Sequence, residues 1–282
     1  MTLRNRWRKF LSYFMLSLTG VCAVLAVSLL FVILGYLVYN GWRSVNWNFF
    51  TQLPKSPGET GGGMANAIVG SFEIVALATL IGLPIGFMAG IYLSEFGGRT
   101  FSFLVRYMAD LLNGVPSIVI GIFAWSVVVV PMHGFSAIAG GVALSVMLIP
   151  ITARSTEQFM SSVPQTLREG ALALGASKWK TIATVVVPAA YRGIATGMIL
   201  GVARIAGETA PLLFTSLSNQ YWSTSLTQPT ASLPYLIYVR ATSPYEDWHR
   251  QAWAAGMVLL LMVLFANIAA RLVLARGIAV QK

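Results

Sequence analysis

Long apolar runs constrain the fold of this chain more than any other feature. Six segments are apolar enough to cross a lipid bilayer, which takes about 20 helical residues. They are residues 11–38, 68–93, 115–130, 135–149, 188–214 and 252–274. The third and fourth are short, and we expect adjacent helix to extend them over residues 101–113 and 152–160. The sequence therefore predicts an all-α polytopic membrane protein with six transmembrane helices.

Composition supports this class and argues against several others. Only 10% of the residues are charged, against about 25% in an average soluble domain. The single cysteine, Cys22, and two distant histidines, His133 and His249, offer neither a disulfide framework nor a metal-ligand pair. The glycine run 61–63 is not followed by the Gly-Lys-Ser/Thr of a nucleotide-binding loop. We therefore expect no metal, no cofactor and no enzymatic activity in this chain.

Lysine and arginine residues are distributed unevenly between the two sides of the six spans. Thirteen of the 19 lie in the N-terminal tail, in the connections after the second and fourth spans, and after the sixth span. Four lie in the opposite connections, and Arg192 and Arg204 lie within the fifth span. Because basic residues accumulate on the cytoplasmic side, we expect a multi-pass protein of the inner (plasma) membrane with both termini in the cytoplasm. The net charge of +10 then reflects topology and contact with anionic membrane lipid, and we expect no nucleic-acid partner.

A polar segment separates the fourth and fifth spans. Glu169, Ala171 and Gly175 follow the spacing Glu-x-Ala-x-x-x-Gly, and the run Val-Val-Val-Pro that ends at Pro188 comes after them. The distribution of basic residues assigns this segment to the cytoplasm, where a soluble partner would reach it. An ordinary amphipathic connector would also fit the pattern.

Charged residues also interrupt the predicted spans. Arg204 and Glu208 are four residues apart, which places them on one face of a continuous helix, and Thr209 follows. Ionisable groups inside a span usually face a polar cavity or a partner. Two interpretations stay open: Arg204 meets an anion in a pathway while Glu208 orients or neutralises it, or the two form a structural salt bridge. Near the third span, we expect Asp110 to cap a helix end or to pair with Arg106.

Glycines form a stripe along the same fifth span. Gly193, Gly197 and Gly201 recur at every fourth position. Small residues at this spacing let two helix backbones approach closely. We therefore expect this stripe to pack against another helix.

Two parts of the sequence resemble a known family. The polar segment and its Val-Val-Val-Pro run resemble the EAA loop of ABC-importer permeases, the element that docks into an ATPase subunit. The residues at the motif positions are Glu169, Gly170, Ala171, Gly175 and Pro188, with Gly170 in place of the usual alanine. Residues 203–215, together with 61–67, 90–95 and 116–121, are similar to the permease subunits of phosphate ABC transporters.

The resemblance covers residues 61–271 and implies a MetI-like ABC importer permease core. We accordingly divide the chain into a cytoplasmic tail, first span and outer loop (1–64), the permease core (65–275) and a second cytoplasmic tail (276–282). The family implies four partners: a second homologous permease, two copies of a cytoplasmic ABC ATPase, an extracytoplasmic phosphate-binding protein and inorganic phosphate as substrate. ATP hydrolysis would belong to the ATPase. The resemblance also favours a substrate-pathway role for Arg204, with Glu208 and Thr209 beside it.

Other substrates and classes stay open on the residues alone. Sulfate and molybdate are tetrahedral oxyanions too, and a permease for either would share most of these features. Glu208 weakly favours phosphate, because a carboxylate accepts a proton from protonated phosphate but not from sulfate. An independent channel or a secondary transporter would need no ATPase-docking element, which the Glu169 segment disfavours.

Overall fold

The computed structural model describes residues 3–56, 59 and 61–279, and every regular element within them is helical. The first half contains α1 (Leu3–Gly41), η1 (Trp42–Ser44), α2 (Trp47–Thr51), α3 (Ala65–Glu95), α4 (Arg99–Gly114), α5 (Ser117–Ala124), η2 (Trp125–Val129) and α6 (Val130–Met132). The second half contains α7 (Ala137–Ser161), α8 (Gln165–Ala173), α9 (Lys178–Thr181), η3 (Ile182–Val186), α10 (Val187–Ala206), α11 (Ala210–Thr215), α12 (Leu233–Ala241) and α13 (Glu246–Ala279).

The predicted fold class is confirmed. Among the described residues, five helices are long and apolar enough to cross a membrane. They are Trp7–Ser44, Ala65–Glu95, Ala137–Ser161, Lys178–Ala206 and Glu246–Leu274. The predicted third span differs from a simple helix, because Thr100–Gly114 and Ser117–Met132 meet at an angle of 103°. Counting this bent pair as one crossing gives six.

The bend between α4 and α5 has a local cause in the sequence. Val115 precedes Pro116 and is extended, with φ −68° and ψ 132°. The proline ring clashes with the backbone of a preceding residue in the helical conformation, so helices usually end at that point. The helix predicted over 101–113 therefore forms, but it does not continue in a straight line into the third span.

The helix α7 lies at the centre of the bundle, between two glycine-lined neighbours. On α3, a methyl group built on Gly86 would lie 2.7 Å from Thr152 of α7, and one on Gly90 would lie 2.5 Å from Thr156. On α10, Gly193, Gly197 and Gly201, each four residues apart, approach α7 in the same way. Because both neighbours lack side chains at the contact, the three backbones pack closely and bury much of α7.

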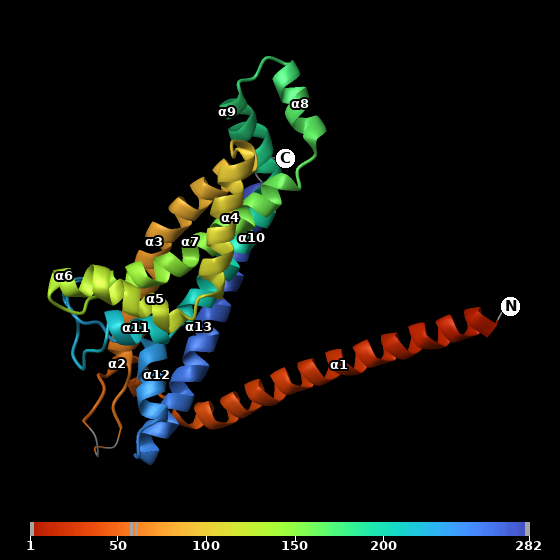
Figure 1. The fold of residues 1–282 in the computed structure, drawn as a ribbon. Coiled ribbons are helices and arrows are strands. Elements are labelled where there is room, and N and C mark those ends of the chain that lie inside the picture. The colour runs from red at the N-terminus through yellow and green to blue at the C-terminus, as the bar shows by residue number, and fades with distance from the viewer. Residues whose placement is uncertain (1–2, 57–58, 60, 280–282) are drawn as a thin grey trace.

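The first helix stands apart from this bundle. Figure 1 shows α1 extending away from it, with only its C-terminal end beside α13. There the ring of Tyr36 packs edge-on against Trp253 at 5.2 Å between centroids. Gly41 lies so close to α13 that an added methyl group would be 2.9 Å from the Trp253 carbonyl oxygen. The rest of α1 is a long apolar surface exposed in the single chain.

Candidate functional site

The polar segment forms a helical hairpin that projects from one end of the bundle, as α8 and α9 in Figure 1 show. Gly175 makes the turn between them with φ +82°, a conformation that glycine adopts without steric cost. Its amide donates to the carbonyl of Leu172 at 2.9 Å. The Ser177 hydroxyl then caps α9 by accepting from the amide of Lys180 at 3.4 Å. Glycine is needed here for its backbone angle, because the space around Gly175 is open.

Several apolar side chains of this hairpin are exposed in the single chain. Leu174 is 91% exposed, and Leu167 and Leu172 are also exposed. Trp179 is exposed too, although its ring packs against Phe96 at 4.8 Å between centroids. Glu169 is exposed among them, beside Gly170. Exposed apolar side chains near a charged one are typical of a protein–protein contact. The arrangement therefore offers a docking surface that includes the motif residue Glu169.

The inner side of the hairpin is anchored by Arg168, whose side chain is only 13% exposed. Its Nη2 donates to Oε1 of Glu95 at 2.9 Å and to the carbonyl oxygen of Met160 at 2.7 Å. Its Nη1 donates to the carbonyl oxygen of Val163 at 2.5 Å. Arg168 thus ties α8 to the C-terminal ends of both α3 and α7. In the sequence, Arg168 is only one of the basic residues that indicate topology, and no spacing rule connects it with Glu95, 73 residues earlier.

The connection from the hairpin into the bundle passes through a π-helical turn. In η3, the amide of Val187 donates to the carbonyl of Ile182, five residues earlier. Pro188 follows at once in α10. Proline lacks an amide hydrogen and its ring clashes with the carbonyl four residues earlier, so a wider turn relieves both problems. The same order of elements occurs at η2. There the amide of Val130 donates to the carbonyl of Trp125, and Pro131 follows.

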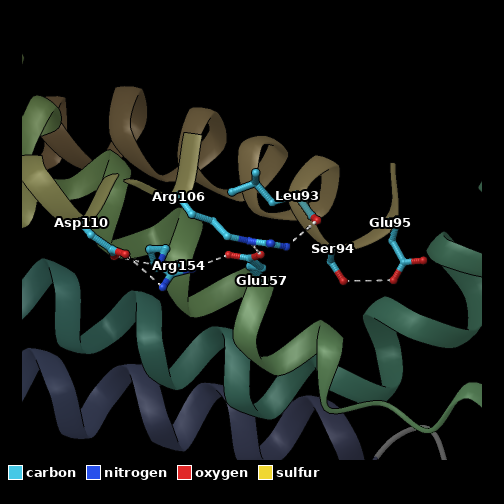
Figure 2. A network of polar contacts seen from close by, with 7 residues as sticks. All are labelled: Leu93, Ser94, Glu95, Arg106, Asp110, Arg154 and Glu157. Atoms are coloured by element: carbon cyan, nitrogen blue, oxygen red, sulfur yellow. Dashed lines mark hydrogen bonds and ion pairs between the residues drawn. The ribbon is translucent and has the colours of Figure 1, made fainter. Parts of the chain in front are cut away.

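A second polar network joins α4 to α7 (Figure 2). Glu157 is buried and accepts from two arginines, Nε of Arg106 and Nη1 of Arg154, the latter at 2.9 Å. Arg154 also donates through Nε to Asp110 at 3.0 Å. The predicted pairing of Asp110 with Arg106 is therefore wrong. Each residue instead finds its partner on α7, because the polar face of α4 lies against that helix.

The fifth span ends earlier than predicted. The helix α10 stops at Ala206, Gly207 caps it, and α11 begins at Ala210. Glu208 consequently lies beyond the helix, so the prediction that it shares a helical face with Arg204 is wrong. Gly207 and the nearby Pro211 explain the break, because neither favours a continuing helix.

Arg204 is exposed on the last turn of α10, whereas Glu208 is half-buried. Within the part of the chain that the structure describes, they form no ion pair with each other or with any other residue. Thr209 has one weak polar contact, from Oγ1 to the carbonyl of Pro234 at 3.5 Å. The break therefore holds a cation, Arg204, and an anion, Glu208, that have no ion-pair partner among the described residues. Beside them is the Thr209 hydroxyl, which makes only one weak hydrogen bond there.

The glycine stripe of α10 lies against α7. An added methyl group would be 2.1 Å from the Phe159 ring at Gly193 and 1.7 Å from the Ser155 hydroxyl at Gly197. At Gly201 it would be 3.0 Å from Leu148. Substitution at the first two positions would force α10 and α7 apart.

Arg240 is a further buried cation, on α12 and outside the candidate spans. Its guanidinium lies over the Trp248 ring at 5.5 Å, and its Nη1 has no hydrogen-bond partner among the described residues. Burial lowers the pKa of Arg240 to about 10, so the side chain still carries its charge at neutral pH. This burial was not predictable from the sequence, because Arg240 lies in the connection between the fifth and sixth predicted spans.

Comparison with known proteins gives a consistent result. The family described as "Binding-protein-dependent transport system inner membrane component" matches residues 82–277. A phosphate transport system permease protein PstA of Yersinia pestis is 43% identical over 274 residues, which cover 97% of this chain and 93% of that protein. The corresponding protein of Haemophilus influenzae is 45% identical and covers 96% of each chain.

Solved structures agree in fold. An inward-facing structure of the methionine ABC transporter MetNI matches with a TM-score of 0.61 and 17% identity, over 76% of this chain and 96% of that one. A bacterial ABC transporter involved in the import of the polysaccharide alginate matches with a TM-score of 0.60 and 16% identity, over 95% and 97%. At these identities the likeness concerns the fold alone.

Proposed function

Since this chain belongs to the family of binding-protein-dependent transport system inner membrane components, we propose that it is the permease subunit of an ATP-driven phosphate importer. The observation that carries the proposal is identity above 40% along nearly the whole chain to two proteins named as phosphate transport permeases. In this role the chain forms half of the translocation pathway, beside a second homologous permease.

The α8–α9 hairpin is the coupling element of this proposal. Two cytoplasmic ATPase subunits would serve the two permeases, and one would receive the exposed surface around Glu169 and Leu174. Both termini and the hairpin then lie in the cytoplasm, and an extracytoplasmic phosphate-binding protein delivers substrate to the opposite end. ATP-driven approach of the ATPases would displace the hairpin and repack the spans, so that the pathway opens alternately to each side.

Arg204 is the pathway cation of this proposal. Transfer of a multiply charged anion into a low-dielectric region is unfavourable, and a nearby cation lowers the free energy of that transfer. Support comes from the exposure of Arg204, its lack of an ion-pair partner among the described residues, and its place where α10 breaks. Glu208 and Thr209 lie at the same break, where they are available to accept or donate hydrogen bonds to the anion.

Purification and transport together test the proposal. A tag on this chain should bring down an ATPase and a second permease from mild detergent. The complex is reconstituted into proteoliposomes with the ATPases facing the lumen and the binding protein added outside. These vesicles should accumulate phosphate only when the lumen contains ATP. Excess sulfate or molybdate should leave phosphate uptake unchanged. Uptake of sulfate or molybdate in preference to phosphate would transfer the assignment to the other oxyanion, and uptake without ATP would favour a channel or secondary transporter.

Reporter fusions test the orientation separately. Fusions after Arg99, Lys178 and Lys282 should read as cytoplasmic, and fusions in residues 39–67 and 218–251 as external, because basic residues concentrate on the first set of connections. An external result at Lys178 would remove the hairpin from the reach of an ATPase.

A further inference from the structure

The last turn of α3, residues 93–95, accepts hydrogen bonds from basic side chains of three other helices. Arg106 of α4 donates through Nη2 to the carbonyl oxygen of Leu93 at 3.5 Å. Arg168 of α8 pairs with the Glu95 carboxylate, and Nζ of Lys178 in α9 donates to the Glu95 carbonyl oxygen at 2.5 Å. The last carbonyls of a helix carry partial negative charge, so cations are favourable there. This turn is therefore a junction between α3, α4 and the hairpin.

The pair of Glu95 and Arg168 is the best-defined contact of this junction. Its side chains are 8% and 13% exposed, so water screens the pair only weakly. Both Nε and Nη2 of Arg168 point at the same carboxylate oxygen, at 3.3 and 2.9 Å. The Ser94 hydroxyl donates to that oxygen as well, at 3.2 Å. A side chain held by so many directional contacts fixes the position of α8 relative to α3.

The polar contacts continue from this junction along α4. Figure 2 shows Arg106 between Leu93 and Glu157, with Arg154 and Asp110 beyond them. Asp110 lies one turn before Gly114, where the chain bends by 103° into α5. A chain of polar contacts thus runs from the hairpin, through the end of α3, to the helix that precedes the bend.

We propose that Glu95 is a positioning residue that makes α3 and α4 move with the hairpin during transport. The proposal rests on the proposed function, in which an ATPase displaces α8. The covalent routes from the hairpin lead to α7, through residues 162–164, and to α10, through α9 and η3. The route through Arg168 and Glu95 adds α3, and Arg106 adds α4. Without Glu95, displacement of α8 acts directly on α7 and α10 and reaches α3 and α4 only through their packing against α7, and ATP is hydrolysed without full opening of the pathway.

The test measures phosphate uptake per ATP hydrolysed in the complete transporter with its binding protein. Glu95→Gln keeps the shape of the side chain and removes its charge. We expect this ratio to fall roughly tenfold, the factor that corresponds to one charge-assisted hydrogen bond, with the ATPase rate retained. Glu246→Gln is the matched control, because Glu246 is exposed and has no ion pair among the described residues, and its ratio should equal that of the wild type.

A second variant guards against loss of folding. Arg168→Lys keeps a cation opposite Glu95 but loses the planar guanidinium that contacts the carboxylate and the carbonyls of Met160 and Val163, so the ratio should fall here too. Values are normalised to assembled complex. If either variant assembles and its phosphate uptake per ATP is unchanged, the proposal is overturned. Failure of both variants to assemble would also overturn it, because the junction would then be only structural. Absence of ATP-dependent uptake in the wild type would instead contradict the proposed function.

Discussion

The junction of α7 with α8 and the break between α10 and α11 use arginine in opposite ways. Arg168 is nearly buried, and its donors reach a carboxylate and two backbone carbonyls. Arg204 is exposed, and within the described chain it has no ion-pair partner. Both arginines have a glutamate close in sequence, Glu169 and Glu208, yet neither forms an ion pair with it. Proximity in sequence therefore does not identify the partner of a charged residue here.

This difference separates two kinds of role. A cation whose donors are all engaged within the chain holds helices together, and its removal leaves a buried carboxylate without its partner. An exposed cation inside a span is costly to keep unless something outside the chain uses it. We therefore expect removal of the Arg168 cation to act on folding and removal of the Arg204 cation to act on transport.

Arg168→Gln should reduce the free energy of unfolding more than any other substitution considered. A smaller effect would contradict the distinction between the anchoring Arg168 and the exposed Arg204. The substitution leaves the buried Glu95 carboxylate without its cation and removes contacts to α7, so folding should lose about 3–5 kcal/mol. Denaturant unfolding in mild detergent measures this loss. Lys180→Gln, on the exposed side of α9, is the control and should unfold like the wild type. Equal stability of the two variants would mean that Arg168 does not anchor the hairpin.

Arg204→Gln should abolish phosphate uptake while the free energy of unfolding changes by less than about 0.5 kcal/mol, as for other exposed positions. Uptake and detergent stability are measured on the same preparation. The double variant Arg204→Gln/Glu208→Gln sharpens the result. If the two residues formed only a structural bridge in the complex, removal of both charges would restore uptake. We expect the double variant to stay inactive.

Glu169→Lys tests the residue next to Arg168, which is about 100° further round α8 and exposed. Because Glu169 has no ion pair among the described residues, the chain should fold normally. Reversal of its charge should weaken capture of the ATPase and block uptake. Co-purification of the ATPase is the measurement, and Glu169→Gln distinguishes loss of the charge from its reversal. Full capture of the ATPase by the lysine variant would remove Glu169 from the docking surface.

Gly175→Ala should have the smallest effect, set against Gly170→Ala. Both glycines have open space around them, but only Gly175 has a positive φ. An alanine there should cost about 1–2 kcal/mol, because left-handed backbone is unfavourable for residues with a Cβ. An alanine at Gly170, inside α8, should stabilise the helix by about 0.5–1 kcal/mol. Unfolding measurements on the pair would contradict the proposed turn if both substitutions had the same sign.

Much of the fold followed from the sequence, because long apolar runs and prolines act locally. The approximate positions of the spans and the close approach of α10 to another helix were predictable from composition and spacing. The partners of charged residues were not. Glu157 lies near the C-terminal end of α7, and its partner Arg106 is 51 residues away. No periodicity connects them, since their contact depends on how α4 packs against α7.

The end of the fifth span shows the same limit. Four-residue spacing predicts a shared face only while the helix lasts, and Gly207 ends it between Arg204 and Glu208. The sequence contained both the spacing and the glycine. Only the structure reveals which of the two determines where Glu208 lies.

The π-helical turn η3 also sets the angular phase of the fifth span. Such a turn holds one residue more than an α-helical turn, and one residue corresponds to about 100° of rotation about a helix axis. Deletion of a single residue from Ile182–Val186 would therefore rotate α10 by that angle relative to the anchored hairpin. Gly197 would turn away from Ser155, and Arg204 would turn with it. The number of residues in this connection is consequently as constrained as their chemistry, because that number sets the rotation of α10 about its axis relative to the hairpin.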